Sequence, residues 1–195
     1  MRTFCGGDYK EAAYYDRLRA CGEDTRIYQS ARLIRPQHIT IGRGCRIDDF
    51  TFLFGGEDLL IDDRVHISSF SSIVGGGHTR IESYAGLSAG CRLITGSENY
   101  QGEGLTNPCI PEEFRSVKRS HVTIRKHALL FTNVIVFPGV EIGAGSVVSA
   151  ASIVSHDLDP WGIYRMKNGR LFRVKDRPCE RILELEQQCI ARYGY

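Results

Sequence analysis

Residues 41–53 read IGRGCRIDDFTFL, and residues 61–73, IDDRVHISSFSSI, and 81–93, IESYAGLSAGCRL, repeat the same spacing. In each stretch a branched aliphatic residue recurs every six positions, and each triplet restarts twenty residues after the previous one. A helix repeats about every 3.6 residues and a strand about every 2, so neither produces this spacing. Extended along the chain, the pattern gives six triplets: Cys21, Ile27, Leu33; Ile41, Ile47, Leu53; Ile61, Ile67, Ile73; Ile81, Leu87, Leu93; Ile124, Leu130, Val136; and Ile142, Val148, Val154.

A six-residue step with one large aliphatic side chain is a short strand followed by a turn. Three such steps close a triangular coil, and successive coils stack their aliphatic side chains in columns. The repeat therefore predicts an all-β solenoid, a parallel β-helix shaped as a prism. Positions four residues after each aliphatic are mostly small, as at Cys45 and Cys91, because little room remains inside a corner. We interpret these cysteines as packing residues.

The six-residue rhythm fails over residues 98–121, ENYQGEGLTNPCIPEEFRSVKRSH, a polar run with two prolines. This segment is expected to leave the prism as one long excursion loop. Residues 8–20 lack strong helix breakers and predict an N-terminal helix, and residues 179–193 place apolar side chains on one helical face. We expect a single domain over residues 1–195, made of a helical cap (1–20), the β-helix (21–158), and a C-terminal tail and helix (159–195).

Net charge, apolar runs and cysteine spacing give no sign of nucleic-acid binding, a membrane span or disulfides. The net charge is +2, which gives no reason to expect nucleic acid as a partner. No apolar run approaches the roughly 20 residues that span a bilayer, and the N-terminus lacks a signal-peptide core, so a cytoplasmic location is predicted. Seven cysteines without C-x-x-C spacing favour reduced thiols. His121 and His127 lack an evident third ligand, so no metal site is expected.

The stretch from Val122 to Leu158, VTIRKHALLFTNVIVFPGVEIGAGSVVSAASIVSHDL, resembles the hexapeptide-repeat acetyltransferases. The likeness is to galactoside and maltose O-acetyltransferases and to sugar acetyltransferases of polysaccharide biosynthesis. It implies a left-handed parallel β-helix, a homotrimer, and acetyl-CoA bound in the groove between neighbouring prisms. The active site would then be shared between subunits.

The resemblance also implies which residues meet the cofactor. A small polar residue would contact the pantetheine, a backbone amide would bond near the thioester, a polar pair would lie beside the nucleotide, and arginines would pair with phosphates. On this chain these positions are, in that order, Thr132; Ala150; Ser155 with His156; and Arg170 with Arg173.

Transfer from a thioester to a hydroxyl needs a base. The resemblance implies a histidine about five residues after a core aliphatic, but that offset from Leu93 gives Glu98. The same offset from Ile73 gives His78, and equivalent positions on successive coils lie roughly 5 Å apart. We therefore expect His78 to act as base with Glu98 as its partner. Glu98 acting directly, or His78 as a purely structural corner residue, are the alternatives.

The excursion is the expected acceptor site, because its polar groups and one ring suit a sugar. The favoured function is transfer of an acetyl group from acetyl-CoA to a sugar hydroxyl. Two alternatives remain: N-acetylation of a nucleotide-linked amino sugar, and a non-catalytic β-helix scaffold. The expected acceptor-binding residues are Asn99, Tyr100, Glu103 and Asn107.

Overall fold

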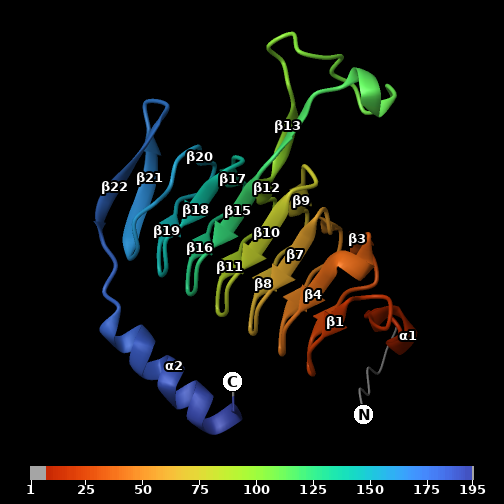
Figure 1. Cartoon of the computed structure of the whole chain (residues 1–195). Helices are drawn as coiled ribbons and strands as arrows, with labels where there is room; N and C mark the ends of the chain where they lie inside the picture. The colour runs from red at the N-terminus through yellow and green to blue at the C-terminus, as the bar shows by residue number, and fades with distance from the viewer. Residues whose placement is uncertain (1–7, 195) are drawn as a thin grey trace.

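The computed structural model describes residues 8–194 and shows three parallel sheets wound into a prism, with the architecture of a left-handed parallel β-helix (Figure 1). The first sheet contains β1 (Ala20–Cys21), β4 (Ile39–Ile41), β7 (Asp58–Ile61), β10 (His78–Ile81), β15 (His121–Ile124) and β18 (Val140–Ile142). The second contains β2 (Arg26–Ile27), β5 (Arg46–Ile47), β8 (His66–Ile67), β11 (Gly86–Leu87), β16 (Leu129–Leu130), β19 (Val147–Val148), β21 (Gly162–Lys167) and β22 (Arg170–Asp176). The third contains β3 (Arg32–Ile34), β6 (Phe52–Phe54), β9 (Ser72–Val74), β12 (Arg92–Ile94), β17 (Ile135–Val136) and β20 (Ile153–Val154).

The strand register confirms the six predicted triplets. Cys21, Ile41 and Ile61 are consecutive partners in the first sheet, and the other two columns align in the same way in their sheets. All of the eighteen predicted core positions except Cys21 are buried. The core is therefore the column of stacked aliphatics that the six-residue spacing predicts, and its burial is the main stabilising term.

Cys45 and Cys91 lie in this core, as predicted for packing residues. Burial raises the pKa of Cys45 to about 12 and that of Cys91 to about 11. Both thiols therefore stay protonated at neutral pH and are poor nucleophiles.

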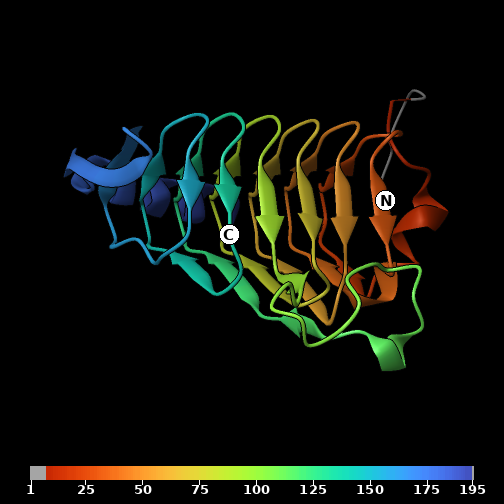
Figure 2. The same cartoon turned by 90° about the horizontal axis from the view of Figure 1, so that it is seen from above.

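The excursion begins and ends two residues earlier than predicted. β13 (Gly96–Glu98) pairs antiparallel with β14 (Val117–Arg119) to form its stem, and β15 already begins at His121. The Ser120 N–H donates to the Thr95 carbonyl at 2.7 Å, and the Ser120 carbonyl accepts from the His78 N–H at 3.0 Å. Ser120 therefore closes the gap in the coil, and residues 96–119 leave the prism. Figure 2 shows the excursion, with its 3₁₀ turn η2 (Glu112–Phe114), leaning over the N-terminal coils.

The predicted N-terminal helix is shorter than residues 8–20. Only α1 (Ala12–Tyr15) is helical, because the Lys10 N–H bonds the Ile27 carbonyl and Tyr9 bridges Tyr28, which ties the segment to the first coil. Residues 1–7 of the predicted cap lie outside the described residues. A second 3₁₀ turn, η1 (Pro36–His38), joins β3 to β4.

The predicted C-terminal helix is present as α2 (Glu180–Tyr193), reached through the antiparallel hairpin of β21 and β22. It runs back along the corner between the first and second sheets (Figure 1). Glu186 contacts His127 on one coil, and the Tyr193 ring lies 5.4 Å from the Arg64 guanidinium on an earlier coil. The helix therefore clamps several coils together.

Candidate functional site

A cavity of about 640 Å³ lies where the excursion leans over the prism. The corners after β6, β9 and β12 supply its floor, and the excursion supplies the opposite wall. Such a volume suits a small organic ligand. The lining residues are Arg35, Phe54, Glu57, Gly75, Gly76, Gly96, Ser97, Glu98, Pro108, Arg115, Val117 and Arg119.

Glu98 and Arg115 form an ion pair on the wall of this excursion cavity. The side chains are only 22% and 17% exposed, so the pair is largely withdrawn from water. Glu98 Oε2 and Arg115 Nε are buried and have no hydrogen-bond partner among residues 8–194. A buried acceptor and donor left unpaired are costly, so a ligand that bonds them is favoured.

The partner of His78 in the described residues is Glu57 rather than Glu98, and a catalytic role for His78 or Glu98 stays a prediction. His78 Nε2 lies 2.8 Å from Glu57 Oε2. The prediction counted Glu98 as the position one coil beyond His78, but the chain has already left the prism at Gly96. The strand partners of His78 are Asp58 on one side and His121 on the other.

The four expected acceptor-binding residues lie in the excursion but do not line its cavity. Asn99 is buried and donates to Glu103, and its side-chain oxygen accepts from the Gln101 N–H at 2.8 Å. The Asn107 side-chain oxygen accepts from the Cys109 N–H at 2.8 Å, which shapes a turn. Tyr100 is 85% exposed. These contacts order the loop, and any ligand contact by the four residues stays a prediction.

Three of the six expected cofactor residues lie together at the C-terminal end of the prism. Ser155, His156 and Arg170 line one cavity of about 480 Å³, between the third sheet and the β21–β22 hairpin. Ala151, the neighbour of Ala150, lines it too, and its N–H donates to the Thr132 carbonyl at 2.9 Å. These residues could hold the phosphates and pantetheine of a coenzyme A molecule.

Arg173 lies apart from this C-terminal cavity. Its guanidinium donates to Asp176 at 2.8 Å and to the Pro160 carbonyl at 3.2 Å. The hydrogen bond to Asp176 raises the pKa of Arg173. Arg170 therefore lines the C-terminal cavity and Arg173 does not, and a phosphate contact by either arginine stays a prediction.

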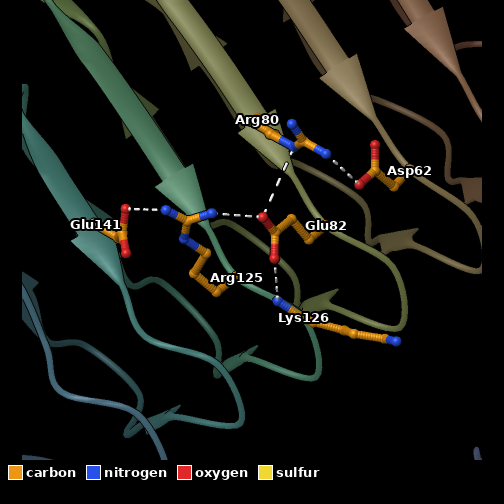
Figure 3. A network of polar contacts seen from close by, with 6 residues as sticks. All are labelled: Asp62, Arg80, Glu82, Arg125, Lys126 and Glu141. Atoms are coloured by element: carbon orange, nitrogen blue, oxygen red, sulfur yellow. Dashed lines mark hydrogen bonds and ion pairs between the residues drawn. The ribbon is translucent and has the colours of Figure 1, made fainter.

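A ladder of charged side chains crosses the ends of four strands in the first sheet (Figure 3). Arg125 binds Glu82 at 2.8 Å and Glu141 at 2.7 Å, and its pKa is raised by the hydrogen bonds to Glu141 and Glu82. Arg80 joins Glu82 to Asp62, and the second Glu82 oxygen accepts from the Lys126 N–H at 3.0 Å. Each charged side chain has a partner of opposite charge, so we interpret this network as ion pairs that stabilise the stacking of neighbouring coils.

Two histidines outside the excursion cavity lie close to carboxylates. His66 Nε2 lies 2.9 Å from Asp48 Oδ2, and His127 Nε2 lies 2.9 Å from Glu186 Oε2. Within the described part of the chain, no three His, Cys, Asp or Glu side chains are grouped closely enough to hold a metal ion. No helix among residues 8–194 is both long and apolar enough to cross a membrane.

Sequence reasoning missed Arg35, Arg115 and Arg119, which supply the positive charge of the excursion cavity. The alternation in RSVKR over residues 115–119 is a strand-like signal that points Arg115, Val117 and Arg119 to one side. Arg35 precedes Pro36 at a corner, and the sequence does not indicate that the excursion bends back over that coil.

The fold and these two cavities define the class as a hexapeptide-repeat, left-handed β-helix protein. No family model matches the chain. The curated dTDP-4-amino-4,6-dideoxy-D-glucose acyltransferase of Escherichia coli is 33% identical over 114 residues. That match covers 58% of this chain and 59% of the enzyme, so the chain matches less than two thirds of its relative.

Solved structures give a longer match. AntD, an N-acyltransferase from Bacillus cereus in complex with dTDP and 3-hydroxybutyryl-CoA, aligns with a TM-score of 0.86 and 27% identity over 97% of this chain and all of that one. A hexapeptide-repeat acetyltransferase from Vibrio cholerae, complexed with acetyl coenzyme A, aligns at 0.56 and 17% over 86% of this chain and 75% of its own, and shows the fold alone. The chain has the fold of the hexapeptide-repeat acyltransferases and is similar in sequence to two acyltransferases with named substrates or ligands.

Proposed function

We propose that this protein transfers an acyl group from an acyl-coenzyme A to the amino group of a nucleotide-linked sugar. The full-length likeness to AntD, an N-acyltransferase crystallised with dTDP and a coenzyme A thioester, supports this function. So does the shorter likeness to the Escherichia coli acyltransferase named for a dTDP-amino sugar. These findings favour N-acylation over the O-acetylation of a sugar hydroxyl that the sequence suggested.

The observation that carries the proposal is the placement of the two cavities along one edge of the prism. The C-terminal cavity contains Ser155, one residue after Val154 of the third sheet, and the excursion cavity contains Gly96, three residues after Leu93 of the same sheet. Leu93, Val136 and Val154 are stacked partners, so two strand spacings, about 10 Å, separate these levels. A pantetheine arm running along this edge would carry its thioester toward the excursion cavity.

Glu98 favours an amine as the acceptor. No histidine lines the cavity, and Glu98 Oε2 has no hydrogen-bond partner among the described residues. A carboxylate in this position can accept a hydrogen bond from an amine and take its proton as the new amide forms. A neutral amine is a better nucleophile than a hydroxyl and needs less help from a base. We therefore assign Glu98 to the acceptor amine. His78 contacts Glu57, which lines the cavity, and is assigned no direct role.

Exposed aromatic side chains support a homotrimer with a shared site. The Phe50 and Phe70 rings, 60% and 61% exposed, stack at 5.4 Å on one corner, and further apolar side chains continue along the third sheet. Exposed large apolar side chains on one sheet and its corner favour an interface, and a cyclic assembly would cover them in every subunit. The exposed members are Phe50, Phe52, Phe70, Phe131, Phe137 and Ile153.

A coenzyme A release assay tests the proposed function. Purified protein is incubated with acetyl-CoA or 3-hydroxybutyryl-CoA and either a dTDP-linked 4-amino sugar or its 4-hydroxy counterpart, and free thiol is measured. Release that requires the amino sugar supports the proposal. Release with the hydroxy sugar alone supports O-acylation, and binding of coenzyme A without release from any acceptor supports a scaffold. A role in cytoplasmic polysaccharide biosynthesis is part of the proposal and depends on the acceptor so identified.

A further inference from the structure

Two arginines line the excursion cavity without a carboxylate partner. Among residues 8–194, neither Arg35 nor Arg119 forms an ion pair, whereas Arg115 in the same cavity is neutralised by Glu98. Arg35 and Arg119 come from different parts of the chain: Arg35 ends the corner before η1, and Arg119 ends β14 of the excursion stem. The cavity therefore has an uncompensated positive region, separate from the Glu98 carboxylate.

Arg35 is held in place by a neutral partner. His38 Nδ1 lies 3.2 Å from the Glu57 carbonyl oxygen, an acceptor, so Nδ1 must carry the proton and donate it. The other ring nitrogen, Nε2, then accepts from an Arg35 Nη2 at 3.3 Å. This contact orients the guanidinium without neutralising it, and the rest of its donor fork stays free for a ligand.

Arg119 is positioned by a glycine. A Cβ at Gly76 would lie 3.3 Å from Arg119 Nε and 3.4 Å from Phe54 Cε1, and the Gly76 φ of 79° also disfavours any side chain there. The absence of a side chain at Gly76 leaves room for both the Arg119 guanidinium and the Phe54 ring, and both line the cavity. A guanidinium fork and an aromatic ring in one cavity suit a phosphate joined to a ring.

We propose that Arg35 and Arg119 bind the two phosphates of a nucleoside diphosphate, and that the attached sugar extends to Glu98. This assignment rests on the proposed function. Guanidinium forks pair with phosphate oxygens through strong charge-assisted hydrogen bonds. The Glu98–Arg115 pair has no net charge to attract phosphate, whereas Glu98 Oε2 is left to accept a hydrogen bond from an amine, so the charges of the cavity fix the direction of the acceptor.

The binding of dTDP, measured by calorimetry without any coenzyme A, tests this site. We expect Arg35→Ala and Arg119→Ala each to weaken dTDP at least tenfold, with partial recovery in Arg119→Lys. Thymidine, which lacks phosphates, should bind weakly and be unaffected by either change. Arg26→Ala is the matched control, because Arg26 is an exposed arginine of β2 in the second sheet, outside the cavity lining and outside the apolar surface of the third sheet, and it should leave dTDP affinity unchanged.

Coenzyme A binding separates the two possible sources of phosphate. If the site serves the acceptor, coenzyme A affinity stays within twofold in both alanine variants. Unchanged dTDP affinity in both variants, or a loss confined to coenzyme A, overturns the assignment. If both alanine variants bind dTDP normally but the protein acylates the amino sugar, only the arginine assignment is refuted. If the alanine variants lose dTDP binding as expected but the protein transfers no acyl group, only the proposed function is refuted.

Discussion

His78 Nε2 lies 2.8 Å from Glu57 Oε2, and Glu57 lines the excursion cavity. Both side chains are about half exposed or more, at 61% and 49%, so the imidazole is solvated. Glu98, in contrast, is 22% exposed and lines the cavity. We predict that Glu98→Gln lowers kcat/KM for the amino acceptor by roughly 10²- to 10³-fold, whereas His78→Asn changes it only a few-fold.

Steady-state kinetics with saturating acyl-CoA measures both effects. Glu113→Gln is the matched control, since Glu113 is an exposed carboxylate of the same excursion outside the cavity lining. Equal losses in Glu98→Gln and Glu113→Gln would show that the loss does not come from amine binding in the cavity. A loss of 100-fold or more in His78→Asn would restore histidine as the base.

Arg170 and Arg173 provide a second comparison. Arg170 lines the C-terminal cavity with Ser155 and His156, whereas Arg173 is bonded to Asp176 and the Pro160 carbonyl. We predict that Arg170→Ala raises KM for acyl-CoA about tenfold, the cost of one charge-assisted contact, and that Arg173→Ala raises it less than threefold. A donor truncated before the nucleotide phosphates should be insensitive to Arg170→Ala. Equal effects on full and truncated donors would contradict a phosphate contact.

The charged ladder centred on Glu82 should contribute to stability rather than to catalysis. Glu82 accepts from Arg125 and from the Lys126 N–H, and its side chain is 19% exposed. Glu82→Ala leaves both donors without this acceptor, so we predict a loss of about 1–3 kcal/mol in the free energy of unfolding. Urea denaturation measures it, and kcat of the folded variant should be unchanged. The exposed Arg181–Glu184 pair supplies the control, because Glu184→Ala should change stability by less than about 0.5 kcal/mol.

The docking of α2 should weaken in acid. Burial disfavours the charged form of Glu186, but hydrogen bonds from Lys126 and His127 outweigh it and lower the pKa of Glu186 below its ordinary value. A lowered carboxylate pKa contributes stability that is present above the unfolded-state value, about 4.3, and is lost as pH falls through the folded-state value.

We therefore predict that Glu186→Gln destabilises the protein at pH 7 and that the difference from wild type shrinks steadily below about pH 5. Thermal unfolding of the two proteins over a pH series measures this difference, and amide exchange in α2 shows where it arises. A difference that stays constant down to pH 3 would mean that the Glu186 charge does not hold the helix.

The fold could be predicted because each coil repeats the same sequence pattern. One large aliphatic per six residues fixes a strand, an inward side chain and a turn, so the register of Ile41, Ile61 and Ile81 can be counted from the sequence. The N-terminal segment could not be predicted in this way. Its pairing with the first coil depends on contacts such as Tyr9 with Tyr28, which no periodicity records.

The candidate site was only partly predictable for the same reason. Ser155, His156 and Arg170 lie near the end of the regular repeat, where the resemblance could place them, and they do line one cavity. The excursion has no period, so its return at Ser120 and the contact of Arg115 with Glu98 depend on tertiary folding. The position of Glu98 was predicted by counting five residues on from Leu93 as if the coil continued, but the chain leaves the prism at Gly96.

The chemistry of the product tests the central claim most directly. A dTDP-linked 4-amino sugar labelled with ¹⁵N at the amine is incubated with acyl-CoA and the protein, and the product is examined by proton–nitrogen NMR and mass spectrometry. N-acylation predicts a new amide N–H correlation, a mass gain of one acyl group, and resistance of the product to hydroxylamine. An acylated product without the amide correlation, cleaved by hydroxylamine as an ester, would contradict the assignment of this protein as an N-acyltransferase.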